Sequence, residues 1–180
     1  DYFQSGKVNE YGPDLPYDWE HREGQTRATL IDIESVCLPF KKAIDMGCGT
    51  GLLVRAMRDR YDVWGYDISE WAVEHADAQA KDRVSVGDAR NLQIVADRSV
   101  DLVICLDVLE HMSHEDASKA LEEMTRIAKK EVVFRVPIAR TIEWDLNKDP
   151  KALAAPTGDL THILVVPEEY WLWQIQRHGW

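Results

Sequence analysis

Three glycines in the stretch IDMGCGTGL, residues 44–52, follow a short apolar run that contains one aspartate, Asp45. They are Gly47, Gly49 and Gly51, and apolar residues at helical spacing come directly after them. This order predicts a strand, a tight turn and the first turn of a helix. Glycine has no Cβ and tolerates positive φ, so such a turn lets backbone N–H groups approach a ligand closely.

Acidic residues follow other apolar runs, in the stretches WGYDIS, VGDARNL and CLDVLEHM. Asp67 ends the first of these runs, where a carboxylate can accept hydrogen bonds from both hydroxyl groups of a ribose. Asp88 follows the next run and is placed to accept from an exocyclic amine. A nicotinamide dinucleotide site requires GxGxxG, but Leu52 stands where the third glycine would be. The residues therefore favour a nucleoside-containing ligand of another kind.

Candidate proton acceptors gather in the third stretch, at Asp107, Glu110 and His111. They fall within one helical turn of each other, so they can converge on one cleft. A histidine with carboxylates beside it can act as a base near neutral pH, and we expect His111 to do so. His114 comes three residues later and is expected to begin the next helix, with Ser113 as its cap.

Short apolar runs alternate with helical patterns along the chain, which predicts a parallel sheet covered by helices on both faces. Right-handed crossovers then give a single domain of the open, doubly wound α/β class. We expect an irregular arm over 1–23, a ligand-binding core over 24–137, and a substrate-side insertion and final helix over 138–180. The predicted strands are 43–46, 62–67, 83–88, 100–107 and 131–137; the predicted helices are 24–38, 51–60, 69–80, 114–129 and one that begins near Pro167 and stops at Gly179.

Composition excludes some classes of protein. The 180 residues carry a net charge of −11, which disfavours nucleic acid as the main partner. No apolar run approaches the ~20 residues of a membrane span. The cysteines Cys37, Cys48 and Cys105 are odd in number and far apart, which indicates a reducing, cytoplasmic location and excludes a zinc site made of thiolates.

The stretches IDMGCGTG, GYDIS, GDARNL and DLVICLDVLEHM resemble, in order and spacing, the successive motifs of class I S-adenosylmethionine-dependent methyltransferases. The resemblance implies a Rossmann-like fold that binds S-adenosylmethionine and releases S-adenosylhomocysteine. It places the glycines under the methionine part of the cofactor, Asp67 at the ribose and Leu106 near the methionyl group. The full set of cofactor-binding residues that we expect is Asp45, Gly47, Cys48, Gly49, Gly51, Asp67, Ile68, Asp88, Ala89 and Leu106.

Some of these roles have simpler alternatives. Asp45 is as well suited to bracing the turn as to binding, and Cys48 is expected to pack rather than to act as a nucleophile. Ile68 would pack on the adenine, while Asp88 and Ala89 would meet its edge.

The same resemblance implies a sheet of seven strands, of which the last two would follow the final helix. This chain stops where the first of those two should begin. We therefore expect five parallel strands in the order 3-2-1-4-5. One sheet edge would be exposed, or covered by a second copy of the chain or by another partner.

The leading hypothesis for the reaction is methyl transfer to an oxygen or nitrogen of a small molecule, such as a metabolite, a sugar or a phenol. Catalysis would rest on His111 with Asp107 and Glu110. The alternatives are a metal-dependent RNA 3′-end methyltransferase, or a domain that binds the cofactor without turnover.

A divalent metal is the second possibility for the same residues. In some relatives an ExxEH element and a later histidine hold a divalent metal, and here Asp107 stands in place of the first Glu. A metal would then be held by Asp107, Glu110, His111 and His162, since carboxylate oxygens and imidazole suit magnesium, manganese or zinc. We favour the metal-free base.

Overall fold

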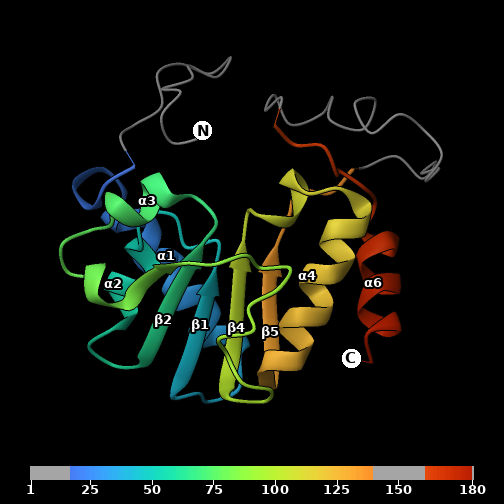
Figure 1. Ribbon diagram of the computed structural model, residues 1–180, viewed down its shortest axis with the longest axis horizontal. Coiled ribbons are helices and arrows are strands. Elements are labelled where there is room, and N and C mark those ends of the chain that lie inside the picture. Colours follow the sequence, from blue (N-terminus) through green and yellow to red (C-terminus); the bar gives the residue numbers. More distant parts are fainter. Residues whose placement is uncertain (1–16, 140–160, 180) are drawn as a thin grey trace.

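The structure is a computed structural model, and it describes residues 17–139 and 161–179. Five parallel strands form one sheet in the order β3-β2-β1-β4-β5 (Figure 1). The strands are β1 Lys42–Met46, β2 Asp62–Asp67, β3 Val84–Val86, β4 Val100–Leu106 and β5 Ala128–Arg135. This order confirms the predicted fold class and topology. It also brings the carboxyl ends of β1, β2 and β4 to the same edge of the sheet.

Helices cover both faces of the sheet (Figure 1). The α-helices are α1 Trp19–Val36, α2 Leu52–Met57, α3 Glu70–Glu74, α4 His114–Ile127 and α6 Glu168–Arg177, and short 3₁₀ turns are formed by η1 Lys81–Arg83 and η2 Leu109–His111. One core cluster joins α1 and α2 to the sheet, and the other joins α4 and α6 to the opposite face. Because successive strand residues face opposite sides, Ala43 lies in the first cluster and Ile44 in the second.

The predicted strands and helices all exist, but several bounds were wrong. α1 begins at Trp19, inside the predicted arm, because the Asp18 side chain caps it by accepting from the His21 amide. α3 is only five residues long, and β3 ends at Val86. β5 starts at Ala128, directly after α4 and three residues before its predicted start at 131. Residues 1–16 of the predicted arm and 140–160 of the predicted insertion lie outside the described residues.

Other expectations about the helices are confirmed. Ser113 caps α4, with its hydroxyl oxygen accepting from the Asp116 amide at 3.1 Å. α6 ends before Gly179, which has a φ of +85°.

Among the residues that the structure describes, no helix has the length and apolarity that crossing a membrane requires.

Candidate active site

The glycine turn is tied to the end of β2 by hydrogen bonds. The Gly47 amide donates to the Tyr66 carbonyl at 2.7 Å. The Asp67 carboxylate accepts from the Gly49 amide at 2.7 Å and from the Ser69 amide at 2.8 Å. Asp67 is buried, and a carboxylate offers about four lone-pair sites, so each oxygen keeps one for a further donor. The predicted ribose acceptor therefore also shapes the turn.

Positive φ and close packing explain two of the glycines. Gly47 and Gly51 both have a φ of +78°. A Cβ at Gly47 would lie 2.2 Å from Cγ2 of Val108, and one at Gly51 would lie 2.7 Å from Cγ2 of Val84. We expected these glycines to let the backbone approach a ligand closely, but protein atoms lie beside these two. Their first role is to let the turn pack against its neighbours.

Asp45 lies on the central strand and is buried beneath this turn. Burial, and then the negative charge of Asp67, raise its pKa to about 7. Tyr17 is 48% exposed overall, yet burial around its hydroxyl group and the charge of Asp45 raise its pKa to about 12. Cys48 is buried against Gly65, and burial raises the pKa of its thiol well above the usual range. Cys48 therefore packs inside the protein, as expected.

The remaining expected cofactor residues differ in their surroundings. Ile68 is 64% exposed next to Asp67, and Ala89 and Leu106 pack against the two core clusters. Both oxygens of Asp88 accept hydrogen bonds from the Arg90 guanidinium, which holds the pKa of Asp88 below its usual range. The structure thus places Asp88 in an ion pair, whereas the sequence analysis expected it to face an adenine amine.

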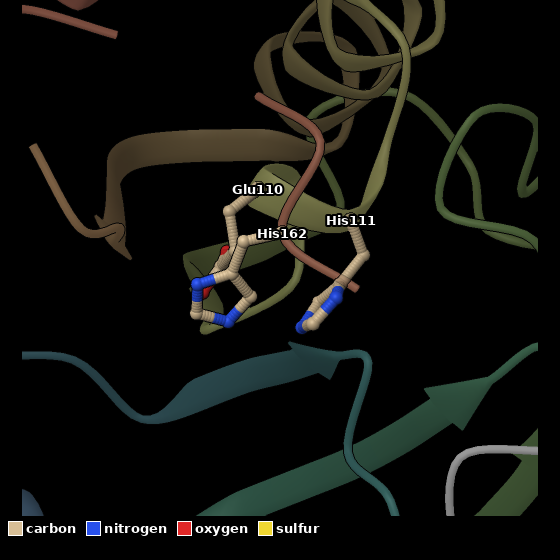
Figure 2. Close-up of side chains that lie close together, drawn as sticks. All are labelled: Glu110, His111 and His162. Atoms are coloured by element: carbon tan, nitrogen blue, oxygen red, sulfur yellow. The ribbon is translucent and has the colours of Figure 1, made fainter. Parts of the chain in front are cut away.

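Three potential proton acceptors or metal ligands meet beside the glycine turn. Glu110, His111 and His162 each offer a ligand atom, and these atoms all lie within 4.8 Å of one another (Figure 2). Glu110 is fully buried, and the histidines are half-buried. A carboxylate oxygen with two imidazole nitrogens is a donor set that fits a divalent transition metal such as Mn²⁺ or Zn²⁺. We call these three residues the EHH cluster.

Two chain segments build the EHH cluster. Glu110 and His111 belong to η2, and His162 comes from the segment that leads into α6. The amides of Ile163 and Leu164 donate to the Glu110 carbonyl at 2.8 and 3.0 Å. These two bonds hold His162 beside η2, although 50 residues, 112–161, lie between His111 and His162 in the sequence.

Thr161 contacts His111 through two oxygens. The His111 Nδ1 atom lies 3.2 Å from the Thr161 carbonyl oxygen and 3.0 Å from its hydroxyl oxygen. With the proton on Nδ1, both oxygens accept from it and the lone pair stays on Nε2, as a base or a metal ligand at Nε2 needs. With the proton on Nε2, the Thr161 hydroxyl group donates to Nδ1 instead. Thr161 was not predicted from the sequence, where its place one residue before His162 was its only signal.

Asp107 does not join the EHH cluster. Its carboxylate pairs with Arg135, with Arg135 Nε donating to Oδ1 at 2.9 Å. Asp107 also has a φ of +56°, which a residue other than glycine rarely adopts. Of the three residues predicted to be catalytic, the structure brings Glu110 and His111 together and turns Asp107 toward β5.

A family model described as a methyltransferase domain matches residues 44–136, which span β1 to the end of β5. The chain belongs to the class I S-adenosylmethionine-dependent methyltransferases. The cofactor of this methyltransferase is accordingly S-adenosylmethionine.

The methyltransferase is similar to a curated relative, the ubiquinone biosynthesis O-methyltransferase of Pseudomonas entomophila (strain L48), at 32% identity over 155 residues. That match covers 77% of this chain and 62% of the relative's length.

Two solved structures share the fold. One is a SAM-dependent methyltransferase from Archaeoglobus fulgidus, at a TM-score of 0.68 and 22% identity, covering 88% of this chain and 68% of the other. The second is the [4+2]-cyclase SpnF, at a TM-score of 0.66 and 22% identity. That match covers 88% of this chain and 59% of SpnF. Because one of these neighbours is named as a cyclase, the fold alone does not fix the reaction, and the side chains of the site must be used.

Proposed function

We propose that this methyltransferase moves the methyl group of S-adenosylmethionine to a hydroxyl oxygen of a small molecule, with phenols as the first class to test. The observation that carries the proposal is the EHH cluster beside the glycine turn. The name of the Pseudomonas relative, an O-methyltransferase, supports oxygen as the acceptor atom.

Methyl transfer to oxygen is an in-line displacement at a carbon already activated by the positive sulfur. The protein has to align donor and acceptor and assist the loss of the hydroxyl proton. On the donor side, Asp67 would hold the ribose while the Gly47–Gly51 turn passes under the methionine part. On the acceptor side, the EHH cluster would face the hydroxyl group.

The EHH cluster can assist proton loss in two ways. His111 Nε2 can accept the proton directly, as we favoured from the sequence. Alternatively, Glu110, His111 and His162 can hold a divalent cation, which would lower the pKa of a bound hydroxyl group. We propose the cation, because the convergence of His162 with Glu110 supplies the oxygen and nitrogen donors that the ion requires.

The experiment begins with calorimetry of S-adenosylmethionine binding to the purified chain. A mass-shift screen for a gain of one methyl group then covers phenols, catechols, sugars, amines and a short RNA. Positive acceptors are assayed again after chelator treatment and after Mn²⁺, Mg²⁺ or Zn²⁺ is restored. We expect a phenolic acceptor, loss of turnover with chelator, and recovery with metal.

Variants separate the two roles of the EHH cluster. His162→Ala should abolish turnover and leave cofactor affinity nearly unchanged. His178→Ala is the matched control, because His178 follows the far end of α6 (Figure 1). Full turnover in the presence of chelator would mean that His111, and not a cation, assists the loss of the hydroxyl proton. Failure to bind S-adenosylmethionine would refute the proposal as a whole.

A further inference from the structure

The acid closest in sequence to the EHH cluster is held away from it. Asp107 precedes Glu110 by three residues, but its two oxygens accept from Nε and Nη2 of Arg135, the last residue of β5. The Asp107 amide also donates to the Arg135 carbonyl at 3.0 Å. Backbone and side chain of Asp107 are thus both bound to the same residue of the neighbouring strand.

The backbone of Asp107 has an uncommon conformation. Its φ is +56°, which lies in the left-handed region that Asp adopts more readily than most residues other than glycine. The two-bond contact with the planar Arg135 guanidinium orients the carboxylate, although both side chains are about half exposed. Leu106 pairs with Arg135 across β4 and β5, so the register of the sheet brings the guanidinium to Asp107.

Arg135 also acts on the electrostatics of the EHH cluster. The hydrogen bonds that Arg135 donates to Asp107 raise the pKa of Arg135, and the negative charges of Asp107 and then of Glu110 add to the effect. The positive charge of Arg135 near Glu110 opposes the binding of a cation. It also neutralises the carboxylate of Asp107, which would otherwise help to bind one.

We propose that Arg135 sequesters Asp107 and thereby limits the EHH cluster to three protein ligands and to a weaker hold on the cation. The inference rests on the cation site of the proposed function. The ion pair between Asp107 and Arg135 would thus set the affinity of the EHH cluster for the cation. Coordination positions that a fourth protein ligand would fill then stay open for the acceptor.

The test is Mn²⁺ affinity, measured by calorimetry and by the electron paramagnetic resonance signal of free Mn²⁺, on the full chain and five variants. Arg135→Gln should bind Mn²⁺ about tenfold more tightly, because a positive charge is lost and Asp107 is released. Adding Asp107→Asn to Arg135→Gln should remove most of that gain. Glu110→Gln should weaken Mn²⁺ binding about a hundredfold or more, since a ligand is removed.

Arg90→Gln is the matched control, because Arg90 makes the equivalent two-oxygen contact with Asp88 outside the EHH cluster. It should leave Mn²⁺ affinity unchanged. Each variant is checked by thermal melting and by S-adenosylhomocysteine affinity. S-adenosylhomocysteine affinity depends on the cofactor site and not on the cation. Its loss would therefore count against the proposed function, whereas unchanged Mn²⁺ affinity in Arg135→Gln would count against this inference.

Three outcomes would overturn the inference. The first is that Asp107→Asn alone weakens Mn²⁺ as much as Glu110→Gln, which would make Asp107 a ligand. The second is that Arg135→Gln binds no more tightly than the unaltered chain, including the case in which neither binds. The third is that the double variant keeps the full gain in Mn²⁺ affinity. That result would mean that only the charge of Arg135, and not the release of Asp107, affects the site.

Discussion

Replacing Gly47 by alanine should destabilise the protein strongly, and the structure separates two causes. Alanine in the left-handed region, at the φ of +78° found here, costs about 1–2 kcal/mol. The new Cβ would also lie 2.2 Å from Cγ2 of Val108, and crowding of that kind costs about 1–3 kcal/mol. The two causes together predict a loss of about 2–5 kcal/mol in the free energy of unfolding, a large part of the ~5–15 kcal/mol of a typical domain.

Urea denaturation followed by tryptophan fluorescence measures this loss, and two further variants divide it. Gly179 has nearly the same φ, +85°, and among the described residues no atom outside its chain neighbours lies within 4 Å of where a Cβ would be, so Gly179→Ala should lose only the ~1–2 kcal/mol of the backbone. Val108→Ala in the Gly47→Ala background should recover the crowding part, judged by a double-mutant cycle. The reasoning is refuted if Gly47→Ala costs no more than Gly179→Ala, or if Val108→Ala recovers nothing.

Two other predictions concern the carboxylates of the cofactor side. Asp67→Asn removes the charge that accepts from the Gly49 and Ser69 amides, so calorimetry should show S-adenosylmethionine affinity reduced by roughly 1.5–3 kcal/mol; unchanged affinity would contradict the role of Asp67. Asp45 has a pKa raised to about 7, so the native state binds its proton more tightly than the unfolded chain, and cofactor-free protein should lose stability as the pH rises through 7. Asp45→Asn should remove that loss from urea midpoints compared at pH 5 and pH 8, and an unaltered pH dependence would count against the raised pKa.

The strands could be predicted because four of them are short apolar runs ended by a glycine or an acid and the fifth is a run stopped by Pro137, and the resemblance to the methyltransferases then supplied their order. The start of α1 was missed because its first turn is polar and carries no apolar periodicity, although Asp18 before it was a readable cap signal. Glu110 and His111 were found because they are adjacent in sequence.

The fate of Asp107 could not be predicted in the same way. Its partner Arg135 is 28 residues away and arrives through the register of β4 and β5. The ion pair of Asp88 with Arg90, two residues apart, was within reach of the sequence and was overlooked.

The carboxylates at the strand ends have a consequence for the order of events in turnover. S-adenosylmethionine enters with a positive sulfur, and S-adenosylhomocysteine leaves as a neutral thioether. Asp67, buried below the glycine turn, would present its negative charge to whichever form is bound. Asp45 would add charge only as the pH rises past its raised pKa of about 7. Attraction to the positive sulfur in a water-poor site would act on the donor and be lost once the methyl group has gone. Loss of the methyl group would thus weaken the hold on the spent cofactor, so that fresh donor could displace it.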